Sequence, residues 1–181
     1  MKIIALIGSL RTGSYNKQLI ETMQERYGDK FDIEIANIGA LPHYNEDIEL
    51  SPGETVGNFK KQIADADGIF ISTAEFNWSI PGVLKNALDW LSRVDKPING
   101  KLVLPLGVSG GALGTVRAQQ HLRQVLSSMG IQAKVLPPAG NEVYIGQAQQ
   151  KFENGKLTDE ATLNFLDQVV EHFIKFTEEN K

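Results

Sequence analysis

Short apolar runs alternate with amphipathic stretches along the whole chain. Five runs rich in aliphatic residues have the length and composition of buried strands, and they lie at 2–7, 31–38, 67–73, 101–108 and 131–136. Apolar residues recur at helical spacing in the segments between and after them, around Leu19 to Tyr27 and at 54–66, 79–93, 113–129 and 158–177. Strands that alternate with helices predict an α/β fold with a parallel sheet and right-handed crossovers.

Local signals refine this pattern. Pro105 lies inside the fourth predicted strand, where it removes a ladder hydrogen bond, so we expect a bulge or a strand end there. Ser79 suits the N-cap of helix 79–93, and Pro81 suits its first turn. No repeat, low-complexity tract or linker divides the chain, so we expect a single domain over 1–181. The expected architecture is a flavodoxin-like three-layer sandwich, with a five-stranded parallel sheet of order 2-1-3-4-5 and helices on both faces.

The composition narrows the function classes. Eighteen basic and 22 acidic side chains give a net charge of −4, which argues against a nucleic-acid partner. The chain has no cysteine, so thiolate nucleophiles and cysteine metal sites are excluded and redox chemistry would need a bound cofactor. The first apolar run is too short for a signal peptide, and no stretch reaches the roughly 18 apolar residues of a membrane span. We therefore expect a cytoplasmic protein with no membrane partner.

The segment GSLRTGSYN, residues 8–16, follows the first predicted strand and precedes a helix. It is not a triphosphate loop, because Ser14 stands where that motif needs lysine, and it lacks the G-x-G of a dinucleotide fingerprint. A phosphomonoester site is the remaining interpretation. Amide groups at the helix start attract such an anion, Ser9, Ser14 and Asn16 can donate hydrogen bonds, and Arg11 adds a full positive charge.

Two further loops should lie at the same edge of the sheet. These are TAEFNWSIPG at 73–82, after the third strand, and SGGALG at 109–114, after the fourth. Gly110 and Gly111 would let the backbone approach a flat ring closely, because they have no side chain. The side chains that could wall such a ring are Phe76, Trp78 and Ile80. Three converging loops predict a mononucleotide site.

The segments GSLRTGSYN, AEFNWSIPGVLKNALDWLSR and GVSGGALGTVRAQQHLR resemble the signature blocks of the NAD(P)H-dependent FMN reductase family, which includes azobenzene, quinone and chromate reductases of flavodoxin-like fold. The resemblance continues into the late segment FENGKLTDE. It implies that the loop at 9–16 holds the FMN phosphate, that residues 75–77 lie along the isoalloxazine and ribityl chain, and that 109–111 lie at the ring's other side. The implied cofactor-binding residues are Ser9, Arg11, Ser14, Tyr15, Asn16, Ala74, Glu75, Phe76, Asn77, Ser109, Gly110 and Gly111.

The chain departs from the family pattern T-P-E-Y-N at Ala74 and Phe76. The first change removes some loop rigidity and the second removes a hydroxyl. FMN binding should survive both, because backbone amides supply much of it. Substrate preference is the property that these departures put in doubt.

The resemblance also implies the reaction. Hydride passes from NAD(P)H to flavin N5, and the reduced flavin then reduces a small-molecule acceptor at the same site, so no catalytic side chain and no metal is expected. Two alternatives bind FMN without turning over a nicotinamide: a flavodoxin-type electron carrier and a non-catalytic sensor module. None of the three histidines has the partners of a hydrolytic triad; His43 lies in a loop that could reach the flavin of a neighbouring subunit.

The apolar stripe on helix 79–93 is wider than a helix facing only a sheet needs. Burial under a loop and burial in a subunit interface explain this width equally well. The resemblance favours a homodimer, with a dimer of dimers as the larger form.

Overall fold

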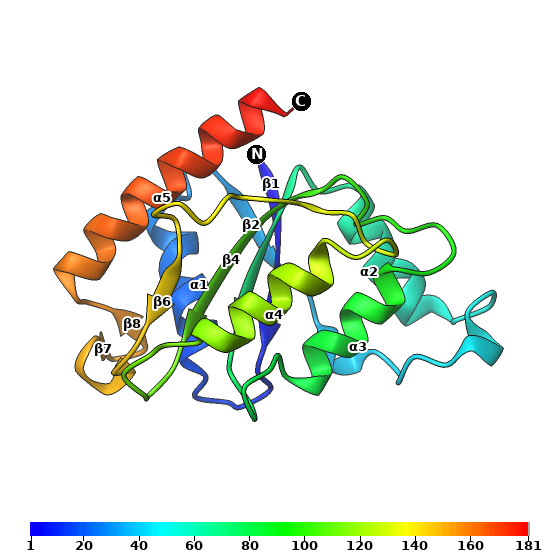
Figure 1. Ribbon diagram of the computed structural model, residues 1–181, viewed down its shortest axis with the longest axis horizontal. Coiled ribbons are helices and arrows are strands. Elements are labelled where there is room, and N and C mark those ends of the chain that lie inside the picture. The colour runs from blue at the N-terminus through cyan, green and yellow to red at the C-terminus, as the bar shows by residue number, and fades with distance from the viewer. Residues whose placement is uncertain (181) are drawn as a thin grey trace.

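The computed structural model describes residues 1–180, and a parallel sheet forms its middle layer (Figure 1). The strand order is β2-β1-β3-β4-β5, and β6 also pairs with β4, so the predicted order is confirmed. Strands β1, β3 and β4 are buried along almost their whole length, which explains their continuous apolar runs. The strands are β1 (Lys2–Gly8), β2 (Asp32–Ile35), β3 (Gly68–Thr73), β4 (Leu102–Val108), β5 (Lys134–Val135) and β6 (Val143–Ile145).

Helices cover both faces of this sheet, as the three-layer prediction requires. One face carries α1 (Tyr15–Arg26) and α5 (Glu160–Glu179), and the other carries α2 (Glu54–Ala64), α3 (Gly82–Leu91) and α4 (Val116–Leu126) (Figure 1). On the α1/α5 face, the rings of Phe31, Phe70 and Phe173 meet edge to face. Each face therefore has its own apolar core.

The fifth strand position is filled by two short strands, which corrects the prediction of one strand over 131–136. β5 pairs with β4 opposite Leu102 and Val103, and β6 pairs opposite Leu106 to Val108. Pro105 falls in the gap between them. The carbonyl groups of Lys101 and Val103 accept hydrogen bonds from the chain of β5, so the backbone groups of every second residue of β4 point to this side. Pro105 is the next residue in this series, and its nitrogen therefore points into the gap between β5 and β6. The missing N–H therefore costs no ladder bond.

Two predicted boundaries are also wrong, and one hairpin was missed. Helix α3 begins at Gly82, with Pro81 as its N-cap, because residues 76–79 form a tight turn that excludes Ser79 from the helix. The second strand is only four residues long rather than the whole of 31–38. A hairpin of β7 (Phe152–Glu153) and β8 (Lys156–Leu157) was not predicted, although its Asn154-Gly155 turn is a strong hairpin signal.

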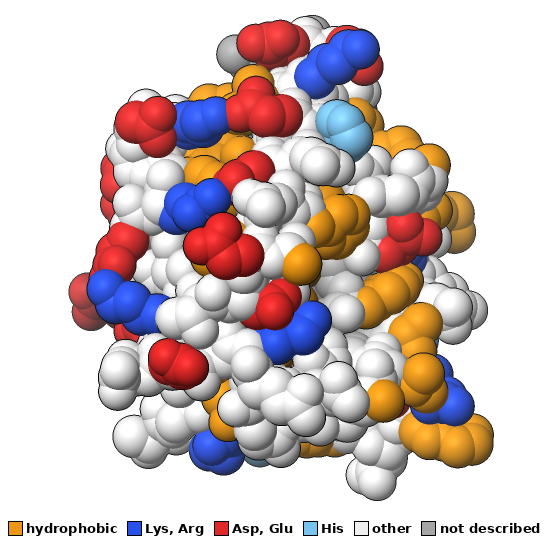
Figure 2. Space-filling view, turned by 90° about the vertical axis from the view of Figure 1, so that its left-hand side faces the viewer, with side chains coloured by type: hydrophobic (Ala, Val, Ile, Leu, Met, Phe, Trp, Pro, Cys, Tyr) orange, Lys and Arg blue, Asp and Glu red, His pale blue; other side chains and the backbone are white. Residues whose placement is uncertain are grey.

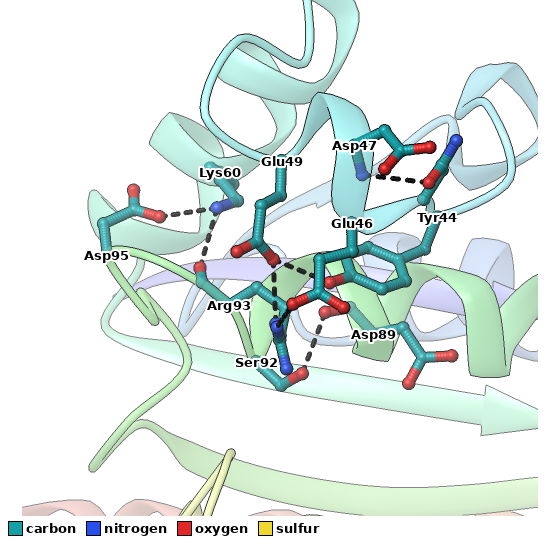
Figure 3. A network of polar contacts seen from close by, with 10 residues as sticks. Tyr44, Glu46, Asp47, Glu49, Lys60, Asp89, Ser92, Arg93 and Asp95 are labelled. Carbon is teal, nitrogen blue, oxygen red and sulfur yellow. Dashed lines mark hydrogen bonds and ion pairs between the residues drawn. The ribbon is translucent and has the colours of Figure 1, made fainter.

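The segment 41–53 covers the outer side of α3. Trp90 Nε1 donates to the Pro42 carbonyl at 2.8 Å, and the Tyr44 ring lies 5.1 Å from the Trp90 ring. Figure 3 shows how Glu49 fastens the segment further, since it accepts bonds from Tyr44 and from Arg93 at the end of α3. The wide apolar stripe of this helix is thus buried within the chain, and burial under a loop accounts for it.

The outer surface of α1 and α5 carries interleaved acidic and basic side chains (Figure 2). Ion pairs join Arg26 of α1 to Asp167 of α5, and Lys30, in the segment after α1, to Glu171 of α5. Within residues 1–180, no helix is long and apolar enough to cross a membrane.

Candidate functional site

The loop between β1 and α1 leads into the first turn of α1, where backbone N–H groups are left without hydrogen-bond partners. Ser14 is the N-cap of α1, and its Oγ accepts a bond from the Lys17 N–H at 3.4 Å. The N–H groups of Tyr15 and Asn16, in the first turn, have no partner among residues 1–180. The Arg11 guanidinium lies 5.5 Å from the centre of the Tyr15 ring, and it forms no ion pair with any described carboxylate. Unpaired donors and an unpaired cation make this loop suited to an anion.

The side chain of Asn16 has a different role from the one that the resemblance implies. It is buried, and its Nδ2 donates to the Val108 carbonyl at 3.0 Å. Its Oδ1 accepts from the Val108 N–H at 3.0 Å and from the Ser72 hydroxyl at 2.9 Å. Asn16 therefore fastens the start of α1 to β3 and β4, and only its backbone N–H is open to a phosphate. Ser72 was missed by sequence reasoning, although a serine in a buried strand is a signal.

The loop after β3 makes a strained turn that presents aromatic rings. Phe76 and Ser79 exchange two backbone hydrogen bonds of 3.0 Å, and the residues between them, Asn77 and Trp78, have φ of 52° and 64°. A positive φ is rare for a tryptophan and marks a backbone held by its surroundings. Phe76 and Trp78 are 56% and 72% exposed. The expected third wall residue, Ile80, lies instead in the core under the turn.

This turn is held against α4 by three contacts, which we call the α4 clamp. Glu75 Oε2 accepts from the backbone N–H groups of Arg117 and Ala118, both at 3.0 Å. The Arg117 guanidinium lies 4.6 Å from the centre of the Trp78 ring. Ser79 Oγ is 2.7 Å from His121 Nδ1. The Glu75 carboxylate thus caps a helix and joins the loop after β3 to the element after β4.

Two glycines near the end of β4 differ in why they are glycine: Gly107 lies within β4, and Gly111 lies in the loop after it. A Cβ on Gly107 would lie 1.8 Å from Thr115 Oγ1, so the packing of the chain itself requires glycine there. A Cβ on Gly111 would meet nothing closer than 3.7 Å, and its φ is not positive. The fold therefore gives no steric reason for glycine at Gly111. Close approach of a ligand is a reason that remains.

The three loops enclose one cavity of about 250 Å³ at the carboxyl edge of the sheet, the lower edge in Figure 1. Ten of the twelve predicted residues line it; Asn77 and Gly111 do not. Val108 is the one lining residue that was not predicted. The ten are Ser9, Arg11, Ser14, Tyr15, Asn16, Ala74, Glu75, Phe76, Ser109 and Gly110.

The donors around this cavity fit a flavin mononucleotide. The phosphate would meet Arg11 and the open N–H groups of the α1 start, and the only carboxylate in the lining, Glu75, is already bonded to α4. The three histidines lie apart from any triad among residues 1–180. His121 pairs with Ser79, His172 with Asn141 at 2.7 Å, and His43 is exposed.

Comparisons with known proteins agree with this geometry. The model of the NADPH-dependent FMN reductase family matches residues 1–150. The NADH-dependent flavin reductase subunit 2 of Lactobacillus johnsonii is 37% identical, over 99% of this chain and 98% of that protein. The quinone reductase of Escherichia coli K12 is 35% identical, over 100% of this chain and 97% of that protein.

A solved structure is similar along the whole chain. FerB, a flavoenzyme NAD(P)H:(acceptor) oxidoreductase from Paracoccus denitrificans, superposes with a TM-score of 0.87 at 32% identity, covering 99% of this chain and 98% of its own. The chain thus belongs to the NADPH-dependent FMN reductase family, as an oxidoreductase with FMN and NAD(P)H as its cofactors.

Proposed function

We propose that this enzyme transfers reducing equivalents from NAD(P)H to a small-molecule acceptor by a ping-pong mechanism, with both substrates using one site in turn. FMN, when bound, supplies the chemistry, because its N5 accepts a hydride from the nicotinamide and passes electrons on. Quinones, azo compounds, nitroaromatics, metal oxyanions and free flavins are the candidate acceptors. The names of the relatives favour a quinone or a flavin.

The observation that carries this proposal is the cavity shared by the three loops. Ser9, Ser14 and the open N–H groups of the α1 start would bind the phosphate, and Arg11 would balance its charge. Ser109 and Gly110 line the opposite side, where backbone can approach a flat ring. No side chain in the cavity is required as an acid or base, and we assign none.

The exposed turn supplies a surface for the second substrate. Phe76 lines the cavity, and Trp78 stands beside it with its ring held by Arg117. Aromatic rings favour stacked or edge-to-face contacts with other flat rings and exclude water from them. The α4 clamp fixes this turn, so a flat acceptor would meet a preformed surface.

Steady-state kinetics of the FMN-loaded enzyme test the mechanism. NADH and NADPH would each be varied against a quinone, an azo dye, a nitroaromatic, chromate and free FMN. Parallel double-reciprocal lines are expected for a ping-pong mechanism, and intersecting lines would contradict it. Nicotinamide oxidation that no acceptor accelerates would favour the electron carrier or the sensor module. A protein that cannot be loaded with FMN would contradict all three.

Arg11→Ala tests the phosphate site directly. A charge-assisted hydrogen bond contributes about 1.5–3 kcal/mol, so FMN affinity should fall roughly tenfold or more while the melting temperature of the apoprotein stays unchanged. Lys175→Ala is the matched control, because it removes one positive charge from an exposed position on α5. Unchanged FMN affinity in Arg11→Ala would show that the loop does not hold the phosphate.

We also propose a cytoplasmic homodimer, with a dimer of dimers as its larger form. Leu50 and Val94 are 85% and 54% exposed, and they line one depression beside the end of α3. Exposed apolar residues gathered in this way favour a subunit contact. A monomer by light scattering at micromolar concentration would contradict the dimer.

A further inference from the structure

The Asn16 side chain fills a strand position at the end of β4. Strand β3 pairs with β4 as far as Ser72 and Leu106, and Val108 lies two residues further along β4. The backbone groups of Val108 point to the β3 side, because the alternate residues of β4 bond to β5 and β6. There the Val108 N–H donates to Asn16 Oδ1, and the Val108 carbonyl accepts from Asn16 Nδ2, both at 3.0 Å. One carboxamide thus occupies the place that a further residue of β3 would take.

The hydroxyl of Ser72 holds this carboxamide from the β3 side. Ser72 Oγ donates to Asn16 Oδ1 at 2.9 Å. Ser72 has no exposed surface and Asn16 is 3% exposed, so water does not compete for these bonds. The carboxamide has one orientation, because the reverse one would set Asn16 Nδ2 against the Val108 N–H. The Asn16 side chain is therefore fixed to two strands at once.

Asn16 also belongs to both ends of the proposed FMN site. Its backbone N–H lies in the first turn of α1 and has no partner among residues 1–180, so it is available to the phosphate. Its side chain holds Val108, which lines the cavity beside Ser109 and Gly110. These two residues begin the loop that would lie along the ring. One buried side chain thus connects the turn that would bind the phosphate with the loop that would bind the ring.

We propose that Ser72, acting through the Asn16 side chain, holds these two ends at one separation, so that the site binds a flat ring and its terminal phosphate as a unit. Ser72 does not line the cavity, so it is a positioning residue. This inference rests on the proposed function, since it takes the ligand to be FMN. A ligand that meets two groups at a fixed separation binds its second part in an intramolecular step. A loosened connection loses this advantage, while the ring alone binds about as well as before.

The ratio of the riboflavin Kd to the FMN Kd measures this advantage. Riboflavin has the ring without the phosphate, so the ratio reports what the phosphate adds once the ring is bound. We expect Ser72→Ala to raise the FMN Kd by about fivefold and the riboflavin Kd by less than about twofold. Asn16→Ala, which removes all three hydrogen bonds and keeps the backbone N–H, should lower the ratio by about tenfold or more. Fluorescence titration of the apoprotein with each flavin measures both constants.

Thr22→Val is the matched control. Thr22 is 8% exposed on α1 and does not line the cavity, and its Oγ1 accepts from the Leu157 N–H at 3.1 Å. The variant loses a buried hydroxyl, as Ser72→Ala does, so its melting temperature should fall. Its ratio of riboflavin Kd to FMN Kd should stay within about twofold of the wild-type value. A purely structural role of Ser72 would give this same pattern in Ser72→Ala.

The inference is overturned if Ser72→Ala keeps the wild-type ratio, or if Thr22→Val lowers the ratio as much as Ser72→Ala does. Ser72→Ala decides the question alone if Asn16→Ala does not fold. A wild-type protein that binds neither FMN nor riboflavin would overturn the proposed function and this inference together. Tight FMN binding with an unchanged ratio would overturn this inference and leave the proposed function standing.

Discussion

At the scale of single residues, Glu75 does the most to join separate parts of the site. Its carboxylate accepts two backbone N–H groups at the start of α4, where the helix dipole favours negative charge. The side chain is only 15% exposed, so solvent screens these bonds little. Loss of the carboxylate would leave the two N–H groups unpaired and release the turn that carries Phe76 and Trp78.

Glu75→Ala should therefore weaken both stability and the site. Loss of a helix cap costs about 0.5–2 kcal/mol, and we expect a decrease of this size in the free energy of unfolding. KM for a flat acceptor should rise more than kcat falls, because the turn loses its support. Urea denaturation and steady-state kinetics measure the two effects. Glu178→Ala is the control, because Glu178 is exposed on α5 and forms no polar contact with the other residues of 1–180. Equal stability in the two variants would contradict the role of Glu75.

We expect opposite results from substitution of Gly107, within β4, and of Gly111, in the loop after it. Gly111→Ala should leave the melting temperature unchanged or slightly higher, because alanine fits there and reduces the entropy of the unfolded chain. FMN affinity should fall roughly tenfold if the ring approaches this backbone. Gly107→Ala should instead destabilise the fold, because its Cβ would overlap Thr115 Oγ1. Flavin fluorescence titration and thermal denaturation separate these outcomes, and full FMN affinity in Gly111→Ala would contradict ligand approach at this residue.

The sequence predicted which residues surround the site better than what each side chain does. Loop position follows from strand order, so ten of the twelve candidate residues line one cavity. The bonds of Asn16 to Val108 and of Glu75 to α4 connect residues 92 and 42 or 43 positions apart. Such partners depend on tertiary packing and leave no local pattern. Ile80 was misassigned for the same reason, because the turn at 76–79 directs it into the core.

At the scale of elements, segment 41–53 covers an apolar side of α3 that a partner chain could otherwise have covered. Trp90 is fully buried, and its indole N–H bonds to the Pro42 carbonyl. The ion pairs of Arg93 with Glu49 and of Lys60 with Asp95 close the far end of this contact (Figure 3). The helix can therefore keep a wide apolar stripe within a single chain.

Trp90→Phe should loosen this segment. The smaller ring leaves a cavity and removes the indole donor, so we expect a loss of roughly 1–3 kcal/mol in the free energy of unfolding. Limited proteolysis should cut the variant faster within 41–53. Trp78→Phe is the matched control, because Trp78 is 72% exposed and its replacement should change stability by less than about 0.5 kcal/mol. Equal protease resistance of Trp90→Phe and wild type would contradict the anchoring role.

The elements that were predicted least well are the shortest ones. Long buried strands and amphipathic helices carry strong periodic signals, and all of these were found. β5 and β6 have two and three residues, and their pairing depends on where Pro105 leaves a gap in β4. The prediction of one strand over 131–136 rested on a pattern of apolar residues, and such a pattern does not show which neighbouring strand it will pair with.

At the scale of the whole molecule, polar contacts between α1 and α5 join the N-terminal and C-terminal parts of the chain. Arg26 Nε and Nη2 donate to the two oxygens of Asp167 at 2.7 and 2.6 Å, and the Tyr27 hydroxyl donates to Asp167 Oδ1 at 2.8 Å. The Arg26 hydrogen bond holds the pKa of Asp167 below its usual value, against the effect of burial. The pKa values of Glu49, Asp65 and Asp159 are lowered as well, each chiefly by a side-chain hydrogen bond, and no described carboxyl group has a resolved increase.

These shifts set the direction of the acid response. A carboxyl group with a lowered pKa binds fewer protons when folded than when unfolded, so its contribution is complete above the unfolded value near 4. The contribution is lost as the pH falls from there through the lowered folded value. Stability should therefore be flat between about pH 5 and 8 with respect to these groups and should decrease steadily below about pH 4.

Asp167→Asn isolates one part of this response. At pH 7 the variant should be less stable by about 1 kcal/mol, a value reduced for solvent screening because the Asp167 side chain is 39% exposed. At pH 2–3 the two proteins should approach each other in stability, since wild-type Asp167 is then protonated as well. Urea denaturation at several pH values measures this difference, with Tyr27→Phe as a variant that removes one bond to the carboxylate and keeps the ring. A stability difference that does not change between pH 7 and 2 would show that Asp167 acts through packing and not through its charge, and the closure of α5 on α1 would then owe nothing to this ion pair.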